Sequence, residues 1–148
     1  MSESVEQFWQ RYLAAGGKDG AYTAWRFGDT PEMATRLGLL VRDGPKRATA
    51  SLVSDYPEGG GPIPAEGDLS IILDGEGQPL CVIETTQIDI RPFSEVDAAF
   101  AWDEGEGDRT LPDWKDGHRD FFAARGEPLA DDTLMVLERF DLLWAPGT

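Results

Sequence analysis

The chain has little of several features that would define a class of protein. Its 148 residues include one cysteine, which excludes an intrachain disulfide and a cysteine-based zinc cluster. No apolar run approaches the roughly 18 residues that a membrane-spanning helix requires, so we expect no membrane partner. The first residues lack the basic and apolar regions of a signal peptide, and we therefore expect a reducing, cytoplasmic location.

Basic residues are also scarce. Thirteen Lys and Arg stand against 28 Asp and Glu, giving a net charge of −15, which argues against a nucleic-acid clamp over the whole surface. The imbalance is uneven, because residues 1–50 hold seven basic and six acidic side chains. An anion-binding site is therefore expected mainly in the first third of the chain.

The remaining composition, 41% hydrophobic and 28% charged, is typical of a globular protein, and we predict a single domain over 1–148. Apolar spacing and capping residues predict helices over 4–15, 31–44, from 94 onward, and around 114–122. Alternating runs predict strands over 47–54, 68–74, 79–90 and 133–144, with loops at 18–29 and 101–110. The pattern predicts an α+β fold: a mixed, mostly antiparallel β-barrel with flanking helices, and residues 1–19 forming an N-terminal helix packed on it.

One carboxylate interrupts an apolar face in strand 79–90. Period two places Glu84 on the same face as Leu80 and Val82. Burial there would raise its pKa, which suits general acid–base chemistry. The alternative is a structural carboxylate satisfied by an arginine or by backbone amides.

A Gly-Pro-Lys-Arg turn follows the second predicted helix. Lys46 and Thr49 have opposite parity, so Lys46 must lie in the turn and Thr49 on the following strand. A lysine beside a buried glutamate can act as a base or an anion anchor, and Thr49 as a nucleophile or an orienting donor. The alternative is that Lys46 and Arg47 are solvated cations near a helix C-terminus.

An acidic loop places carboxylates at alternate positions, Glu104, Glu106 and Asp108. Such spacing can suit a hard divalent metal, although the sequence is not that of an EF-hand. The alternative is that these side chains are solvated or cap a helix.

Two further features are candidates for binding. His118 is the only histidine, and a lone histidine on an aromatic helix is either a packed side chain or a proton shuttle. Trp25, Arg26 and Phe27 form an aromatic–basic–aromatic segment that can stack a nucleobase and pair with a phosphate. The alternative is that the aromatic rings anchor a loop to the core.

Together these segments resemble the ASCH family in its longer bacterial form, and they run in order from about residue 20 to 145. The residues that carry the resemblance are Trp25 to Gly28, Leu40 to Ser51, Pro64 to Asp68, Cys81 to Thr86, Glu104 to Asp108, Trp114, His118, Phe121, Phe122 and Glu138 to Phe140.

The resemblance implies a PUA-like β-barrel with a cleft that has a lysine at its rim. Short members of the family are N4-acetylcytidine amidohydrolases that need no cofactor and use a Lys, a Thr three residues later and a Glu on a following strand. Lys46, Thr49 and Glu84 match that pattern. The resemblance implies that Thr49 attacks the acyl carbon, Lys46 takes its proton and Glu84 orients or relays.

A longer member resembling this chain is a ribonuclease on single-stranded RNA, stimulated by a divalent metal such as Mn or Mg. By that resemblance Lys46 and Arg47 would hold phosphate, Trp25 or Phe27 would stack a base, and Arg26 or Arg139 would supply the grip that the family gives to a further arginine. The family motif is Gly-x-Lys-x-x-x-x-Arg, and this chain has Ser51 where the arginine is expected.

Three functions are therefore expected, in this order. The first is a hydrolase that cleaves single-stranded RNA at a cleft around Lys46, with Ser51 and His118 among the substrate contacts and Glu104, Glu106 and Asp108 as metal ligands. The second is an amidohydrolase of a modified nucleoside, which uses Lys46, Thr49 and Glu84. The third is a non-catalytic module that binds RNA or a nucleotide. The sequence leaves the oligomeric state open.

Overall fold

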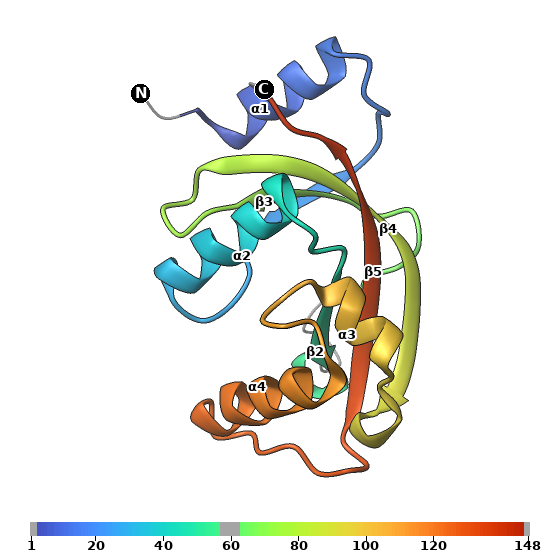
Figure 1. Ribbon diagram of the computed structural model, residues 1–148. Helices are drawn as coiled ribbons and strands as arrows, with labels where there is room; N and C mark the ends of the chain where they lie inside the picture. Colours follow the sequence, from blue (N-terminus) through green and yellow to red (C-terminus); the bar gives the residue numbers. More distant parts are fainter. Residues whose placement is uncertain (1–2, 57–62, 147–148) are drawn as a thin grey trace.

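A curved five-stranded sheet organises the chain (Figure 1). The computed structural model describes residues 3–56 and 63–146. The sheet has the order β1-β3-β4-β5-β2, in which β1 runs parallel to β3 and the other neighbours are antiparallel. Its strands are β1 (Tyr22–Trp25), β2 (Ala48–Leu52), β3 (Leu69–Leu73), β4 (Pro79–Pro92) and β5 (Leu134–Trp144).

The predicted β-barrel is not confirmed, because the sheet formed by the described residues is not closed. Strands β1 and β2 are its two edges, and they are only four and five residues long. Closure would require these edges to pair in a matched stagger. Instead they face one another across a cavity, which is lined by Trp25 on one side and by Ser51 on the other.

The curvature comes from the two long strands, β4 and β5. Their pairing register shifts twice, between Val82 and Ile83 and between Thr85 and Gln87. Each such irregularity bends a strand and increases its twist. The sheet therefore wraps partly around the space that a barrel would enclose.

Helices α1 (Val5–Ala14) and α2 (Pro31–Asp43) form where capping residues and apolar spacing predict them. Ser4 and Gln7 make a reciprocal capping box on α1, and Thr30 caps α2 ahead of a proline in the first turn. Helix α4 (Leu111–Ala124) likewise confirms the predicted helix around 114–122. No helix in the described parts of the chain is long and apolar enough to cross a membrane.

Three local predictions are wrong. The predicted loop 18–29 contains β1, a short strand whose order comes from pairing with β3 rather than from its own sequence. Ser94 lies in a 3-10 turn, Phe93–Glu95, and the following helix, α3 (Ala98–Glu104), is capped by Asp97 instead. The first part of the predicted loop 101–110 is therefore helical.

The helices cover different parts of the sheet. Helix α1 packs Phe8, Trp9 and Tyr12 against one face of β3 and β4. Helix α2 packs on the opposite face of the same strands, while α3 and α4 pack over β2 and the start of β5. This arrangement leaves a space between α2 and α4, beside edge strand β2.

Candidate functional site

The structure places Lys46 in the turn before β2, as predicted, with its side chain fully buried. Its Nζ donates to Glu104 Oε1 at 2.9 Å and to Glu106 Oε2 at 2.7 Å. It also donates to the backbone oxygen of Ala48 at 2.8 Å. A buried ammonium is costly unless it is paired and hydrogen-bonded, and here both conditions are met.

Gly105 allows the acidic segment, residues 103–106, to lie in close contact with the backbone of Lys46. Its φ is 68°, and a Cβ at this position would lie 2.7 Å from the Cα and the nitrogen of Lys46. A backbone hydrogen bond stabilises this contact: the Arg47 backbone N–H donates to the backbone oxygen of Asp103 at 2.7 Å. The Glu-Gly-Glu spacing therefore lets two carboxylates clasp one ammonium around a glycine that has no side chain.

The charges of this cluster oppose the effect of burial on each titratable group. Burial alone would lower the pKa of Lys46, but Glu104 and Glu106 outweigh it and raise that pKa. Burial would raise the pKa of Glu104, but Lys46 and His118 outweigh it and lower that pKa. Burial raises the pKa of Glu106, and the Lys46 charge only partly offsets this. Lys46 is therefore a fixed cation rather than a free base.

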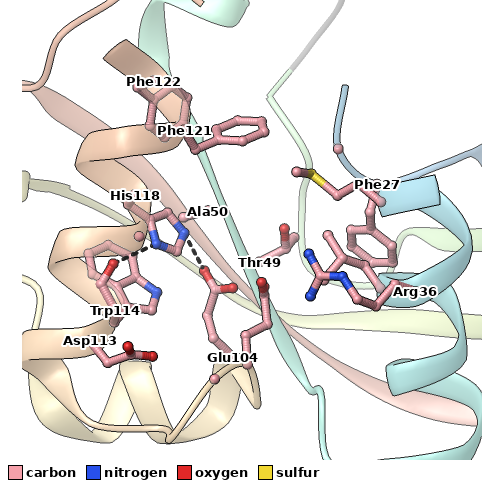
Figure 2. Close-up of a pocket in the computed structure, with 16 residues that line it drawn as sticks. Phe27, Arg36, Thr49, Ala50, Glu104, Asp113, Trp114, His118, Phe121 and Phe122 are labelled. Carbon is pink, nitrogen blue, oxygen red and sulfur yellow. Dashed lines mark hydrogen bonds and ion pairs between the residues drawn. The ribbon is translucent and has the colours of Figure 1, made fainter. Parts of the chain in front are cut away.

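Glu104 and Glu106 also line a hollow of about 270 Å³ between α2 and α4 (Figure 2). Thr49 and Ala50 of β2 lie at its inner wall. Most of the remaining wall is apolar or aromatic, and it includes Phe27, Met33, Leu37, Trp114, Phe121 and Phe122. We call this cavity the first hollow.

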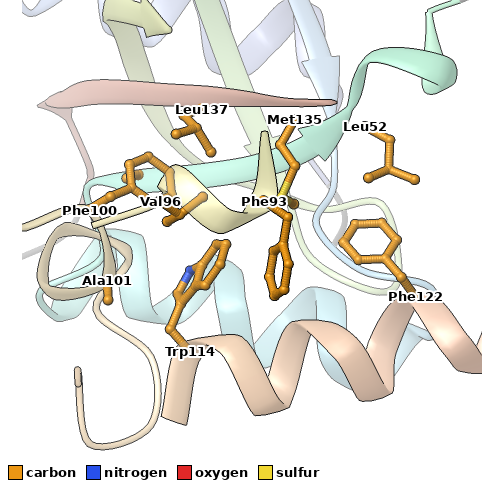
Figure 3. Close-up of a cluster of buried hydrophobic side chains, with 10 residues drawn as sticks. Leu52, Phe93, Val96, Phe100, Ala101, Trp114, Phe122, Met135 and Leu137 are labelled. Atoms are coloured by element: carbon orange, nitrogen blue, oxygen red, sulfur yellow. The ribbon is translucent and has the colours of Figure 1, made fainter. Parts of the chain in front are cut away.

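His118 enters the first hollow from α4, stacked on Trp114 with ring centroids 3.9 Å apart. Its Nδ1 donates to the Trp114 oxygen at 2.8 Å, and its Nε2 lies 3.3 Å from Glu104 Oε2. Burial would lower the pKa of His118, but Glu104 outweighs it and raises that pKa. Trp114 itself packs against Phe93 and Phe100 in the core beneath α4, which fixes the position of the helix (Figure 3).

A second hollow of about 460 Å³ lies between the two edge strands of the sheet. It shares Phe27, Gly28 and Thr49 with the first hollow, so the two cavities meet at Thr49. Aromatic, hydroxyl and carboxylate side chains dominate the rest of its lining, which includes Thr23, Trp25, Arg26, Ser51, Tyr56, Asp68, Ser70, Thr85 and Glu138.

The structure does not bring Glu84 to this site. Thr85 donates to Glu138 within the second hollow, so its neighbour Glu84 points to the opposite face of β4. There Glu84 Oε2 lies 2.5 Å from Lys18 Nζ. Glu84 does share a face with Val82, as the alternation predicts, but α1 covers that face.

The predicted phosphate grip is also not assembled. The Arg47 guanidinium donates to the backbone oxygens of Val41 and Lys46, and Arg26 donates to that of Gly75. Arg47 thus holds the turn rather than a ligand. Ser51 lines the second hollow, with its hydroxyl 3.0 Å from that of Tyr56.

The three carboxylates predicted as metal ligands do not form a ligand set. The ammonium of Lys46 lies between Glu104 and Glu106, and Asp108 accepts from the backbone nitrogen and hydroxyl of Thr110. No cluster of three His, Cys, Asp or Glu residues suited to a metal occurs in the described ranges. These side chains therefore do not fit a divalent metal.

Sequence reasoning missed two lining residues of chemical interest. Glu138 is the lone acidic residue within the buried stretch of β5, a signal equivalent to the one used for Glu84. Arg36 lines the first hollow from α2, and nothing in its local sequence marks it. Burial raises the pKa of the Cys81 thiol to about 12, so the only cysteine is no nucleophile.

The mostly antiparallel sheet, the helices wrapped around it and the cleft beside a buried lysine belong to a PUA-like fold. A family model described as the ASCH domain matches residues 23–143, and the chain belongs to this family, whose PUA-like fold is associated with RNA binding.

Two solved structures are similar over almost the whole chain. Protein EF3133 of Enterococcus faecalis V583, a member of family DUF984, is 36% identical with a TM-score of 0.80, over 94% of this chain and 87% of that one. An ASCH domain from Lactobacillus crispatus JV V101 is 31% identical with a TM-score of 0.82, over 93% and 92% of the two chains. The search of curated proteins gave no match.

Proposed function

We propose that the protein hydrolyses the amide bond of an N4-acylated cytidine, with Thr49 as the nucleophile. The observation that carries this proposal is the position of Thr49 at the junction of the two hollows. Its hydroxyl makes no hydrogen bond to another described residue, so it is available to a substrate. The buried Lys46 fixes two glutamates in the wall of the first hollow beside it.

The lining of the hollows suits the two parts of such a substrate. The second hollow offers Trp25 and Phe27 for stacking a base, together with hydroxyls that suit a ribose. The first hollow is smaller, and Met33 and Leu37 give it an apolar side suited to an acyl group. The scissile amide would then lie at Thr49, between the base and the acyl group.

The reaction begins when the Thr49 Oγ attacks the acyl carbon and its proton passes to the Glu106 carboxylate. The raised pKa of Glu106 brings this base closer to neutrality, where proton transfer is most effective. The C–N bond breaks as the nitrogen takes a proton from a general acid, the cytidine amine departs, and the acyl group remains on Thr49 as an ester. Water then hydrolyses the ester and releases a carboxylic acid.

Lys46 acts in this scheme as a positioning residue and not as the base. Its ammonium is enclosed by Glu104, Glu106 and the Ala48 oxygen, and it does not line either hollow. Its charge opposes the effect of burial on the pKa of both glutamates, and its hydrogen bonds hold them at the wall of the first hollow. This role replaces the proton transfer to Lys46 that the family resemblance implied.

The same observations give less support to cleavage of single-stranded RNA. A polymer must approach a surface of net charge −15, and the cations Lys46 and Arg47 are already bonded within the protein. The first hollow, at about 270 Å³, suits one small group rather than a strand. The modified nucleoside is therefore placed ahead of RNA.

Incubation with N4-acetylcytidine, followed by chromatography for cytidine and acetate, tests the proposal. Thr49→Val keeps the shape but removes the hydroxyl, and turnover should fall by about three orders of magnitude or more. Thr86→Val is the matched control, because Thr86 is exposed on β4 and lines neither hollow. Full activity in Thr49→Val would overturn the proposed nucleophile.

A labelled single-stranded RNA, assayed in parallel with and without Mn²⁺, separates the remaining alternatives. RNA cleavage without deacetylation would overturn the proposal in favour of a ribonuclease. Silence in both assays would overturn it in favour of a non-catalytic binding module.

A further inference from the structure

Glu138 is a buried carboxylate that the scheme above does not use. It is 6% exposed, lies on β5 and lines the second hollow. Its cross-strand partner on β2 is Thr49. Side chains of directly paired antiparallel residues share one face, with Cβ atoms about 5 Å apart. The carboxyl group therefore lies next to the proposed nucleophile, on the side where the cytidine moiety would bind.

One oxygen of this carboxyl group is anchored and the other is open. The Thr85 hydroxyl donates to Glu138 Oε2 at 2.7 Å. Glu138 Oε1 makes no hydrogen bond to another residue in the described part of the chain, and it is not sealed from solvent. The group thus presents one oriented oxygen to the second hollow.

The surroundings shift the pKa of this group upward. Burial raises the pKa of Glu138, and the charge of Asp68 acts in the same direction, although the Thr85 hydrogen bond opposes both. The other charged or titratable side chains that line this hollow are Arg26 and Tyr56. Glu106, which also lines the first hollow, is paired with the Lys46 ammonium, whereas Glu138 has no ion pair in the described part of the chain.

We propose that Glu138 is the general acid that protonates the leaving nitrogen, an inference that rests on the proposed amidohydrolase function. As the C–N bond of the Thr49 adduct breaks, the Glu138 proton passes to the cytidine nitrogen and Glu138 becomes a carboxylate. The Thr85 hydrogen bond stabilises that carboxylate. At this point Glu106 holds the proton that came from Thr49.

The second half of the reaction restores both groups. Water attacks the acyl carbon from the vacated second hollow and gives a proton to Glu138. The Thr49 oxygen leaves with the proton held by Glu106, and the acyl group departs as a carboxylic acid. The two glutamates thus alternate as acid and base on opposite sides of one hydroxyl.

The test compares a poor leaving group with a good one. An amide nitrogen needs protonation in order to leave, whereas the p-nitrophenolate of p-nitrophenyl acetate leaves unaided. Glu138→Gln should lower kcat on N4-acetylcytidine about 100-fold or more, yet lower the Thr49-dependent ester hydrolysis by less than about threefold. Glu95→Gln, at an exposed position that lines neither hollow, is the control.

A second variant keeps the acid and changes only its pKa. Loss of the Thr85 hydrogen bond in Thr85→Val should raise the pKa of Glu138. Because a general acid must be protonated, activity falls as pH rises through its pKa. The alkaline limb of the kcat profile should therefore move to higher pH in Thr85→Val, and it should be absent in Glu138→Gln.

The outcomes are separable. Equal losses on amide and ester in Glu138→Gln, or an alkaline limb that does not move in Thr85→Val, would overturn the proposed acid while leaving the amidohydrolase intact. No amide turnover by the unmodified protein would instead remove the function and the acid together.

Discussion

Two lysine–glutamate contacts lie in different parts of this sheet, and their surroundings give them different consequences. Lys46 is fully buried and clasped by Glu104 and Glu106. Lys18 is 61% exposed and contacts Glu84, which is 21% exposed, beyond the end of α1. Sequence alone ranks Glu84 above the acidic loop, because it interrupts an apolar strand. In the structure Glu104 and Glu106 line the first hollow, whereas Glu84 lines neither hollow.

Burial of the pair, rather than the type of residue, decides what each contact does. In the solvated pair, water competes for both charges, so little free energy depends on the contact. In the buried cluster, each charge is desolvated and depends on its partners, so removing one leaves the others uncompensated. Only the buried cluster can therefore hold carboxylates in a fixed orientation at a cavity.

Removal of the buried lysine should have the largest effect. Lys46→Met leaves two carboxylates without their ammonium and should lower the free energy of unfolding by about 3–5 kcal/mol. Lys18→Met should leave the urea midpoint nearly unchanged. The measurement is urea denaturation of both variants at pH 7, from which their unfolding midpoints are compared. Equal midpoints would show that the buried cluster is no more important for stability than the exposed pair.

A side chain at Gly105, which would separate the acidic segment from Lys46, should have an intermediate effect on stability. Gly105→Ala combines a left-handed φ with a clash against the Lys46 backbone, and should lower stability by about 2–4 kcal/mol. Gly126→Ala is the matched control: φ is 78° and nothing lies within 4 Å of the added Cβ, so its cost should be about 1 kcal/mol. Thermal unfolding compares them. A similar loss in both would mean that close contact with Lys46 adds nothing.

The sequence predicts most of the fold because its signals are local. Thr30 and Pro31 mark the start of α2, and alternation marks the long strands β4 and β5. The open sheet could not be predicted in this way, since closure depends on whether the short edges β1 and β2 meet. Nor does alternation reveal which face a helix covers, so it could not show that Glu138 lines a cavity while Glu84 lies on the face covered by α1.

Part of the candidate site was also predictable, because local sequence signals place some of its residues. Lys46, Thr49 and His118 lie at or beside the cavities as expected, because a turn, a strand and a helix each place them locally. The clasp of Lys46 by Glu104 and Glu106 joins residues that are 58 and 60 positions apart in the chain. No local pattern reports such a contact.

The smallest effect on activity is expected from the exposed Lys18–Glu84 pair. A variant of this pair tests most directly whether Glu106 rather than Glu84 takes part in the reaction. Glu84→Gln removes the carboxylate that the family pattern suggests, whereas Glu106→Gln removes one that lines the first hollow. Turnover of N4-acetylcytidine should change by less than about twofold in Glu84→Gln and fall about 100-fold or more in Glu106→Gln. Loss in Glu84→Gln but not in Glu106→Gln would return the catalytic role to β4. It would also mean that the face covered by α1 opens during the reaction, because Glu84 cannot otherwise reach Thr49.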